Sequence, residues 1–225
     1  MIAPSLAARS TEPEQLDLDP PREEVRRSLA DLRFVNRWLG GRRALLGAVR
    51  PHLRAGARLL DVGCGSGDLP LHLLERLPGP ILAVGVDIKT LHLLETPPPL
   101  RRVAADLRRL PFPDAAFDVV TASLVLHHFD SADLAPVLRE LYRLSRRALV
   151  VNDLHRSLVP LLFGHAAFPV LFRSPLSVHD GLVSVRRGFR PRELQAAFVA
   201  AGVPGVRIRR RFPYRLLAVA ERLAA

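Results

Sequence analysis

The sequence has 225 residues, of which 48% are hydrophobic and 24% are charged. This length and composition predict one globular domain with an ordinary apolar core, and exclude a disordered chain, a small disulfide scaffold and a coiled coil. The formal charge of +11 points at first to a nucleic-acid or membrane partner. Because Lys89 is the only lysine among 33 basic residues, we attribute roughly half of the excess charge to the codon bias of a GC-rich genome.

The sequence favours a cytoplasmic protein without stable membrane insertion. Its one cysteine, Cys64, cannot form an intrachain disulfide and fits a reducing compartment. Residues 1–15 lack the continuous apolar stretch of a signal peptide. The apolar stretch from Leu158 to Phe172 is too short to span a bilayer, and prolines and a glycine interrupt it.

The first quarter of the chain reads as a tail followed by helices. Residues 1–20 are acidic and polar and contain several prolines, so we expect a flexible tail. Pro21 opens a predicted helix that runs to about Leu39, and residues 42–53 form a second helical segment. We interpret residues 21–55 as a helical lid on a core of residues 56–225, the two parts forming one domain.

From residue 58 onward, short apolar runs alternate with helical periodicity. The predicted strands cover residues 58–62, 81–86, 100–104, 117–122, 148–152, 207–212 and 214–220. The predicted helices cover residues 68–77, 89–95, 132–144 and 191–201. Continuous apolar strands separated by helices indicate a parallel sheet covered on both faces, closed here by a final strand pair. The sequence therefore predicts an α/β fold with a doubly wound, seven-stranded, mostly parallel sheet and an N-terminal helical cap.

A glycine loop joins the first predicted strand to the helix after it. Residues 59–68 read Leu-Leu-Asp-Val-Gly-Cys-Gly-Ser-Gly-Asp, a context typical of a nucleotide-binding turn. The Gly-x-Gly-x-Gly spacing without a following Gly-Lys-Ser/Thr excludes a P-loop. Asp61 disfavours a pyrophosphate and suits a cationic ligand, while Asp87 ends the second strand, where an acid accepts both hydroxyls of a ribose. The two acids predict a pocket for an adenosyl group that carries a positively charged amino acid.

With these residues the sequence resembles the class I S-adenosylmethionine (SAM)-dependent methyltransferases, in the broad group that includes ubiquinone- and menaquinone-biosynthesis C-methylases and many small-molecule O-methylases. Four segments carry the resemblance in order: residues 59–67, 84–87, 105–113 and 117–129. It is strong over residues 56–152 and weak elsewhere. The resemblance implies a Rossmann-like fold and SAM as the cofactor. A looser likeness connects the chain with bacterial secondary-metabolite methyltransferases.

The resemblance also assigns cofactor-binding residues: Asp61, Gly63, Cys64, Gly65, Asp87, Ile88, Asp106, Leu107 and Ser123. By that pattern the loop and Asp61 hold the methionine end, and Asp87 binds the ribose. Asp106 meets the adenine amino group, and Ser123 lines the methyl-donor side. The thiol of Cys64 is expected to be a small filler in the loop and not a nucleophile.

Three residues are candidates for the chemistry, which needs alignment, desolvation and a base. His128 follows the fourth strand and is our candidate base or acceptor ligand; alternatively it shapes its loop. Asp153 ends the fifth strand and either orients a histidine, binds the acceptor or caps the next segment. His179 lies in a predicted turn at residues 179–181 and is either catalytic or structural. Adjacent histidines at 127 and 128 without further ligands are not a typical metal pair, so we expect no metal.

The apolar segment from residue 158 to 172 is either an acceptor pocket or a plain core helix. As a pocket, its aromatic side chains Phe163, Phe168 and Phe172 favour an aromatic or lipid-tailed acceptor. In the helix before Gly40, Trp38 is either part of a lid over the donor or a core anchor.

Methylation of a small, phenolic or lipophilic hydroxyl is the leading functional hypothesis. Carbon methylation of a quinol or polyketide ring is the neighbouring alternative, because the same base activates both. An RNA, DNA or protein methyltransferase is disfavoured, since residues 122–124 read Ala-Ser-Leu where amino-methylating enzymes have an Asn/Asp-Pro-Pro-aromatic motif. A third hypothesis is that the chain only binds the donor and serves as a partner subunit. We expect a small-molecule acceptor and no nucleic acid, and the sequence does not indicate an oligomeric state.

Overall fold

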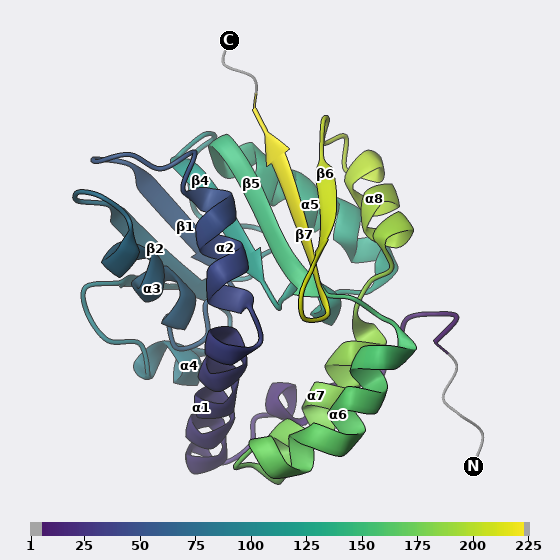
Figure 1. Ribbon diagram of the computed structural model, residues 1–225. Helices are drawn as coiled ribbons and strands as arrows, with labels where there is room; N and C mark the ends of the chain where they lie inside the picture. Colours follow the sequence, from purple (N-terminus) through teal and green to yellow (C-terminus); the bar gives the residue numbers. More distant parts are fainter. Residues whose placement is uncertain (1–5, 223–225) are drawn as a thin grey trace.

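A seven-stranded sheet with helices on both faces organises the computed structural model, which describes residues 6–222 (Figure 1). The strands are β1 (Arg58–Val62), β2 (Leu82–Asp87), β3 (Arg101–Ala104), β4 (Phe117–Ser123), β5 (Ser145–Leu154), β6 (Arg207–Arg211) and β7 (Arg215–Glu221). Their order in the sheet is β3-β2-β1-β4-β5-β7-β6. All pairs among β1 to β5 are parallel, and β7 pairs antiparallel with both β5 and β6. The doubly wound, mostly parallel sheet is therefore confirmed.

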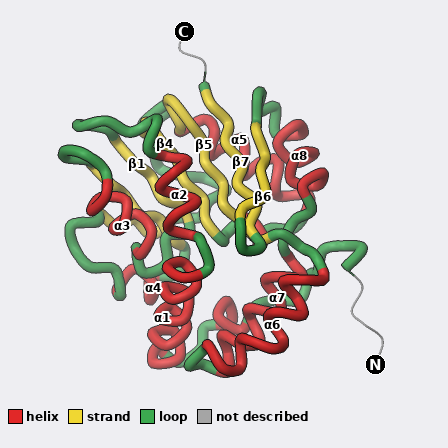
Figure 2. Tube along the Cα trace, viewed as in Figure 1, coloured by secondary structure: helices red, strands yellow, loops and turns green. Residues whose placement is uncertain are grey.

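The helices fall into a group that covers the sheet and a group that extends beyond it (Figure 2). They are α1 (Arg22–Trp38), α2 (Gly41–Val49), α3 (Asp68–Arg76), α4 (Thr90–Leu94), α5 (Ser131–Leu144), α6 (Leu158–Leu171), α7 (Pro175–Arg187) and α8 (Pro191–Ala200), with short 3-10 helices η1 (Gln15–Leu18) and η2 (Leu126–His128). Helices α1, α6 and α7 lie beyond the sheet, together with η1 (Figure 1).

Two apolar cores follow from the alternation of side chains along the strands. In β1, Leu60 packs into a core shared with α5 and α8, whereas its neighbour Leu59 packs into a core shared with α2 and α3. Every residue of β4 is buried, as expected of a central strand covered on both faces. This double cover holds the carboxyl ends of the strands in fixed positions, and the loops that follow those ends form the site.

The predicted turn at residues 179–181 is wrong, because these residues lie in the middle of α7. Gly181 serves close packing there: a Cβ on it would come within 2.7 Å of the ring of Phe168. Gly164 of α6 meets the same ring at 2.8 Å, so the two helices approach each other closely over one phenylalanine. A glycine inside a helix was thus mistaken for a turn residue.

The predicted flexible tail is wrong for residues 6–20, while residues 1–5 lie outside the described residues. Glu14 is buried, and η1 follows it directly. The carboxylate of Asp180 accepts hydrogen bonds from the backbone of Gln15 at 2.8 Å and of Leu16 at 2.9 Å. Farther upstream, the backbone of Ser10 donates to the carbonyl of Arg186 at 3.1 Å. The acids of this segment find basic and hydroxyl partners on distant elements, which holds the segment against the domain.

Candidate functional site

A cavity of about 370 Å³ lies at the carboxyl ends of β1, β2 and β4, within the range of small-molecule sites. Residues predicted from the sequence that line it are Gly63, Gly65, Asp87, Ile88, Asp106, Leu107 and His128. The other predicted residues lie outside this lining: Asp61, Cys64, Ser123, Asp153 and His179. The cavity wall also contains side chains of α1, α6, α7 and the N-terminal segment, so those helices enclose the site from the side opposite the sheet.

The glycine loop brings backbone close to the cavity. Gly63 has φ +64°, and a Cβ on it would lie 2.4 Å from Val125, so neither the conformation nor the packing admits a side chain. The N–H of Gly65 donates to Oδ2 of Asp87 at 2.9 Å, and the N–H of Lys89 donates to Oδ1 at 2.8 Å. Oδ1 also lies 3.5 Å from Nδ1 of His92, so Asp87 is fixed in place, and Oδ2 keeps a lone pair for a further hydroxyl group.

Asp61 is a buried acid directly behind this loop. It accepts a hydrogen bond from the hydroxyl of Thr121 at 2.5 Å. Burial raises the pKa of Asp61 to about 7, and the nearby carboxylates of Asp68 and Asp87 add to this rise. A cationic group close to the loop would favour the ionised form of Asp61. A role of Asp61 toward a positively charged ligand therefore stays a prediction, and the acid lies behind the loop, outside the residues that line the cavity.

Two other predicted donor residues have structural surroundings. Burial raises the pKa of the Cys64 thiol, and its sulfur packs so closely on Gly85 that a Cβ there would lie 2.8 Å away. This matches a small filler and not a nucleophile. The hydroxyl of Ser123 accepts a hydrogen bond from the side-chain amide of Asn152 at 2.7 Å, which joins the ends of β4 and β5.

The part of the cavity that follows β2 and β3 combines apolar and polar side chains. Ile88 is 59% exposed and Leu107 is buried, and both line the cavity. Asp106 accepts the backbone N–H of Arg108 at 2.9 Å. The sequence-based assignment of Ile88, Leu107 and Asp106 to an adenine ring therefore stays a prediction, for which these residues line the same cavity.

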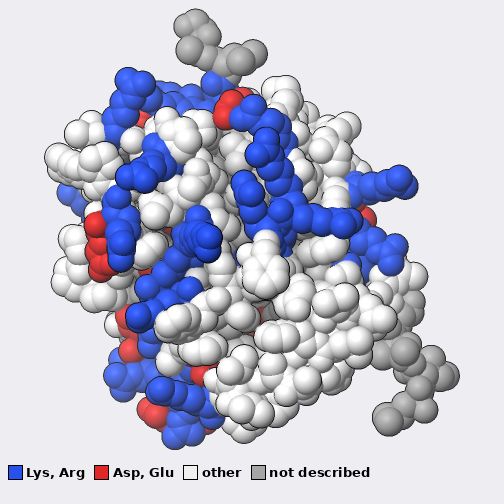
Figure 3. All heavy atoms as spheres, viewed as in Figure 1, with Lys and Arg blue, Asp and Glu red and all other residues white. Residues whose placement is uncertain are grey.

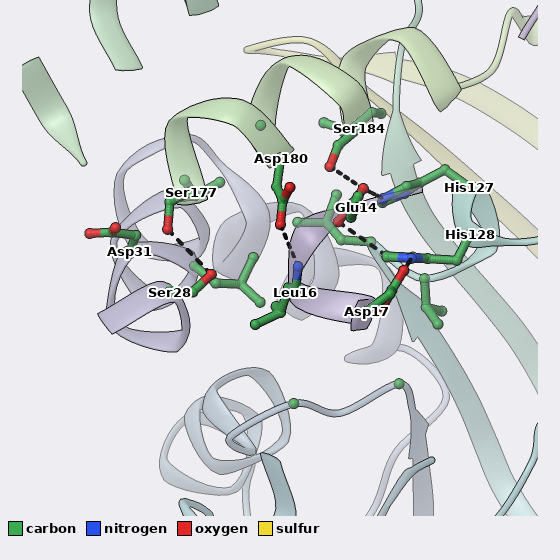
Figure 4. Close-up of a pocket in the computed structure, with 18 of the residues that line it drawn as sticks. Glu14, Leu16, Asp17, Ser28, Asp31, His127, His128, Ser177, Asp180 and Ser184 are labelled. Atoms are coloured by element: carbon green, nitrogen blue, oxygen red, sulfur yellow. Dashed lines mark hydrogen bonds and ion pairs between the residues drawn. The ribbon is translucent and has the colours of Figure 1, made fainter. Parts of the chain in front are cut away.

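A cluster of histidines and acids forms the polar centre of the cavity (Figure 4). Nδ1 of His127 lies 2.7 Å from Oδ1 of Asp153, and its Nε2 lies 3.2 Å from Glu14. Burial opposes a charge on this ring, but the two acids outweigh burial and raise the pKa of His127 to about 10. His127 is therefore an imidazolium held between two carboxylates.

His128 has a partner from the same N-terminal segment. Its Nδ1 lies 2.8 Å from Oδ2 of Asp17, and its Nε2 lies 3.7 Å from Oε2 of Glu14. Burial disfavours the charge of Glu14, but His128 and His127 prevail and lower the pKa of Glu14 to about 2. Glu14 also accepts the hydroxyl of Ser184 at 2.5 Å. The cluster thus joins α7, η2 and the N-terminal segment at one point of the cavity.

The sequence reasoning missed Glu14 and Asp17. Their partners lie more than a hundred residues away along the chain, so no local pattern pairs them. The signal that the sequence offered for them was compositional: Glu14 and Asp17 are acids three residues apart in a chain that is rich in arginine.

Asp153 and His179 are placed next to the cluster and outside the cavity. Asp153 is fully buried and, besides His127, accepts the backbone N–H groups of Leu126 at 3.0 Å and Leu154 at 2.7 Å. It therefore orients the loop that carries the histidines. His179 contacts Asp180 at 3.0 Å and Glu12 at 3.2 Å, so it holds the N-terminal segment.

Three groups of the cluster are also close enough to hold a metal ion. The candidate ligand atoms of Glu14, His127 and His128 lie within 4.8 Å of one another. The two imidazole rings lie 4.5 Å apart and are tilted by 30°, and the Nε2 atoms of both face the carboxylate of Glu14. With the protonated His127 between two carboxylates, the cluster is electrostatically satisfied without a metal. We interpret it as a hydrogen-bonded charge network.

Part of the cavity wall is aromatic. Phe163, Phe168 and Phe172 line it, with the last two rings stacked 4.6 Å apart. Helix α6 therefore contributes a pocket wall as well as core packing. Trp38 lines a different hollow and is 63% exposed, so it is not a core anchor; α1 covers the cavity with Leu29, Leu32 and Val35.

Comparison with known proteins agrees with this geometry. Residues 60–148 match a family model described as "Methyltransferase domain". A demethylmenaquinone methyltransferase of Thermus thermophilus is 40% identical over 100 residues, covering 40% of this chain and 43% of that protein. A 2-phytyl-1,4-naphtoquinone methyltransferase of Nostoc punctiforme is 34% identical over 121 residues, covering 48% and 51%. The chain thus spans about half the length of the curated relatives it matches.

Solved structures share the fold over most of the chain. A SAM-dependent methyltransferase of Aquifex aeolicus superposes with a TM-score of 0.61 at 16% identity, covering 91% of this chain and 95% of that one. Human N-acetylserotonin methyltransferase in complex with SAM superposes with a TM-score of 0.64 at 16% identity, covering 88% and 55%. The fold is that of the class I SAM-dependent methyltransferases. The curated sequences that match include quinone methyltransferases, which confirms the resemblance seen in the sequence.

Proposed function

We propose that the protein transfers a methyl group from SAM to the hydroxyl of a small phenolic or lipophilic acceptor. One observation carries the proposal: a single cavity is lined by the glycine loop and Asp87, by His128 with Asp17, and by three phenylalanines. The cavity thus combines groups for a donor site, a base and an apolar acceptor pocket.

The residues present fit SAM, which when bound supplies an electrophilic methyl group on a sulfonium. Gly63 and Gly65 would hold its methionine end, with Asp61 behind them favouring its positive charge. Asp87 would accept the ribose hydroxyls. The adenine would lie on Ile88 and Leu107, near the carboxylate of Asp106.

His128 is the proposed base. Its Nδ1–H donates to Asp17, which fixes the tautomer and leaves Nε2 as the proton acceptor. The proton of the acceptor hydroxyl passes to Nε2 of His128, and the acceptor oxygen bonds to the methyl carbon as the methyl–sulfur bond breaks. Asp17 stabilises the imidazolium that forms. Water is kept from the reaction by the α1, α6 and α7 walls.

Asp153, His127 and Glu14 are proposed positioning residues. The two carboxylates hold the His127 imidazolium, and this ion pair fixes the loop that carries His128. His179 holds the N-terminal segment in place through Glu12. These residues keep the base aimed at the acceptor without touching the reacting atoms.

Carbon methylation of a quinol or polyketide ring is the alternative. The names of the quinone-type relatives favour it, and His128 would remove the phenolic proton in the same way. We place the reaction in the cytoplasm, in keeping with the free buried thiol of Cys64. An acceptor of low polarity, and no nucleic acid, matches the aromatic pocket.

The test is a product assay. The purified chain is incubated with methyl-labelled SAM and a panel of phenols, quinols, alkyl-substituted phenols and RNA, and products are identified by mass spectrometry. Labelled methyl ethers of phenols support the proposal. Ring-methylated products favour the alternative, and labelled RNA alone overturns both.

A further inference from the structure

Helix α6 exposes an apolar face to solvent. The exposed residues of this helix are Leu158, Val159, Leu162, His165, Ala166, Pro169, Val170 and Leu171. Except for Leu171 at the end of the helix, their spacing of one, three and four residues places them on one side of the helix. Val170 is 83% exposed and Val159 is 62% exposed. The helix contains no Asp, Glu, Lys or Arg between its first and last residues.

The opposite side of α6 is apolar too, because Phe163 and Phe168 line the cavity. A surface helix ordinarily has one polar face, and a helix that is apolar all round is normally covered on all sides. The outer face of α6 is therefore a surface that needs a partner.

Arginines lie beside this apolar face. Phe163 of α6 contacts Tyr214 with ring centroids 5.5 Å apart, which places the β6–β7 turn next to α6. In that turn Phe212 is 91% exposed, and the arginines of β6 before it include the exposed Arg209, Arg210 and Arg211. Figure 3 shows the result on one face of the molecule: Lys and Arg side chains gather over the β6–β7 region, and an uncharged surface covers the region of α6 directly beside it.

We propose that the outer face of α6, together with Phe212 of the β6–β7 turn, docks on the surface of an anionic lipid bilayer. An interfacial helix inserts its apolar face among the acyl chains while cationic side chains meet the phosphates. Tryptophan prefers the headgroup level, which suits Trp38, and its neighbour around one hollow, Phe212, suits the apolar layer below. No helix among residues 6–222 is long and apolar enough to cross a membrane, so the docked chain lies on the bilayer.

The charges favour a bilayer over the other occupants. A second copy would place one arginine-rich margin against another in a chain of net charge +11. A nucleic acid would engage the arginines and leave the apolar face of α6 uncovered. An anionic bilayer satisfies both features at once.

The docked orientation also gives the acceptor a route into the cavity, an inference that rests on the proposed function. Because α6 has one face in the bilayer and the other in the cavity, a lipid-tailed acceptor reaches the aromatic pocket along α6 without crossing water. The pocket residues Phe163, Phe168 and Phe172 then hold the acceptor's apolar part.

Vesicle sedimentation tests the docking without donor or acceptor. The full chain is mixed with vesicles of equal parts phosphatidylglycerol and phosphatidylcholine, or of phosphatidylcholine alone. We expect binding to the anionic vesicles, weakened by high salt, and a loss of about tenfold or more in partitioning for the double variant Leu162→Glu, Val170→Glu. The matched control is Val199→Glu on α8, which is also exposed, at 67%, and is expected to bind like the unaltered chain.

Three results overturn the proposal. They are absent vesicle binding by the unaltered chain, equal binding by the α6 double variant, and a dimer in light scattering that the double variant disrupts, which would make α6 a self-association surface. Circular dichroism is used to check that the variants are folded. Methylation of a water-soluble phenol by the double variant, at the rate of the unaltered chain, separates a docking defect from a failure of the proposed reaction.

Discussion

Nδ1 of His128 lies 2.8 Å from Oδ2 of Asp17, although the two residues are 111 positions apart in the chain. The acid comes from a segment that also reaches the donor side, since Nζ of Lys89 binds the carbonyl of Asp17 at 2.7 Å and the carboxylate of Asp19 at 2.6 Å. The segment therefore gives His128, the proposed base, its carboxylate partner and also contacts Lys89, which follows the end of β2. Residues 14–19 thus connect the proposed base with the donor side of the cavity.

Replacement of Asp17 by Asn is expected to lower kcat by about a hundredfold, because the tautomer and the charge of His128 lose their support. The affinity for SAM, measured by calorimetry, is expected to change little. The matched control is Glu23→Gln, since the Glu23 side chain is 64% exposed and lies outside the cavity. An unaltered kcat in the Asp17 variant would remove this residue from the chemistry.

Replacement of His128 by Ala is expected to lower turnover by about a hundredfold or more and to leave the dissociation constant of SAM within a few-fold of its original value. Steady-state kinetics and calorimetry separate the two quantities. If the variant turns over at the original rate, His128 shapes the loop and another group takes the proton.

Asp87→Ala is expected to abolish measurable SAM binding, because the carboxylate fixes the glycine loop through Gly65 and offers the hydroxyl-binding oxygens. Calorimetry measures the binding, with Asp114→Ala as the control, since that side chain is 79% exposed. Original affinity in the Asp87 variant contradicts the donor assignment.

The buried acid Asp61 predicts a pH dependence of stability. Its pKa rises from the ordinary 3.8 to about 7 through burial, so the folded chain holds a proton that the unfolded chain has lost between these values. The contribution of Asp61 to the free energy of unfolding is expected to fall as pH rises from 4 to 7, by up to about 4 kcal/mol, and to level off above 7, where the pKa of His127, raised to about 10, makes the total fall further. Urea unfolding across this range measures it. In Asp61→Asn that part of the slope is expected to disappear; an unchanged slope would assign it elsewhere.

The same acid predicts that SAM binding depends on pH. A cation favours ionised Asp61, so the affinity is expected to increase between pH 6 and 8, with proton uptake by the buffer on binding. Calorimetry in buffers of different ionisation enthalpy measures this proton. Asp61→Asn is expected to bind more weakly and without the proton release.

Removal of metal ions is expected to leave turnover unchanged, since the Glu14–His127 ion pair satisfies the cluster. Kinetics before and after treatment with a chelator check this. Loss of activity that a divalent transition metal restores would turn the charge network into a metal site.

Most of the fold followed from local patterns in the sequence. Apolar runs located β1, β2, β4 and β5, because a strand buried on both faces consists of little else, and the glycine loop after Val62 located the donor end of the cavity. The strand pair β6–β7 was visible from the alternation around Pro213. These features depend on neighbours in the chain.

The missed features depend on partners far away in the chain. Residues 14–19 look like a polar tail until His127, His128 and Asp180 supply their contacts. Burial of Asp61 and Ser123 behind the cavity wall depends on the packing of β4, which spacing alone does not reveal.

The ring of Phe168 rests on two glycines, Gly164 and Gly181, and forms part of the cavity wall. A methyl group at either glycine would have to displace the ring toward the space between the helices. The position of the Phe168 ring in the cavity wall thus depends on the absence of a side chain at both glycines. Residues 164 and 181 are therefore expected to limit the size of the acceptor. Substitutions there would not touch the donor residues, the proposed base or the sheet.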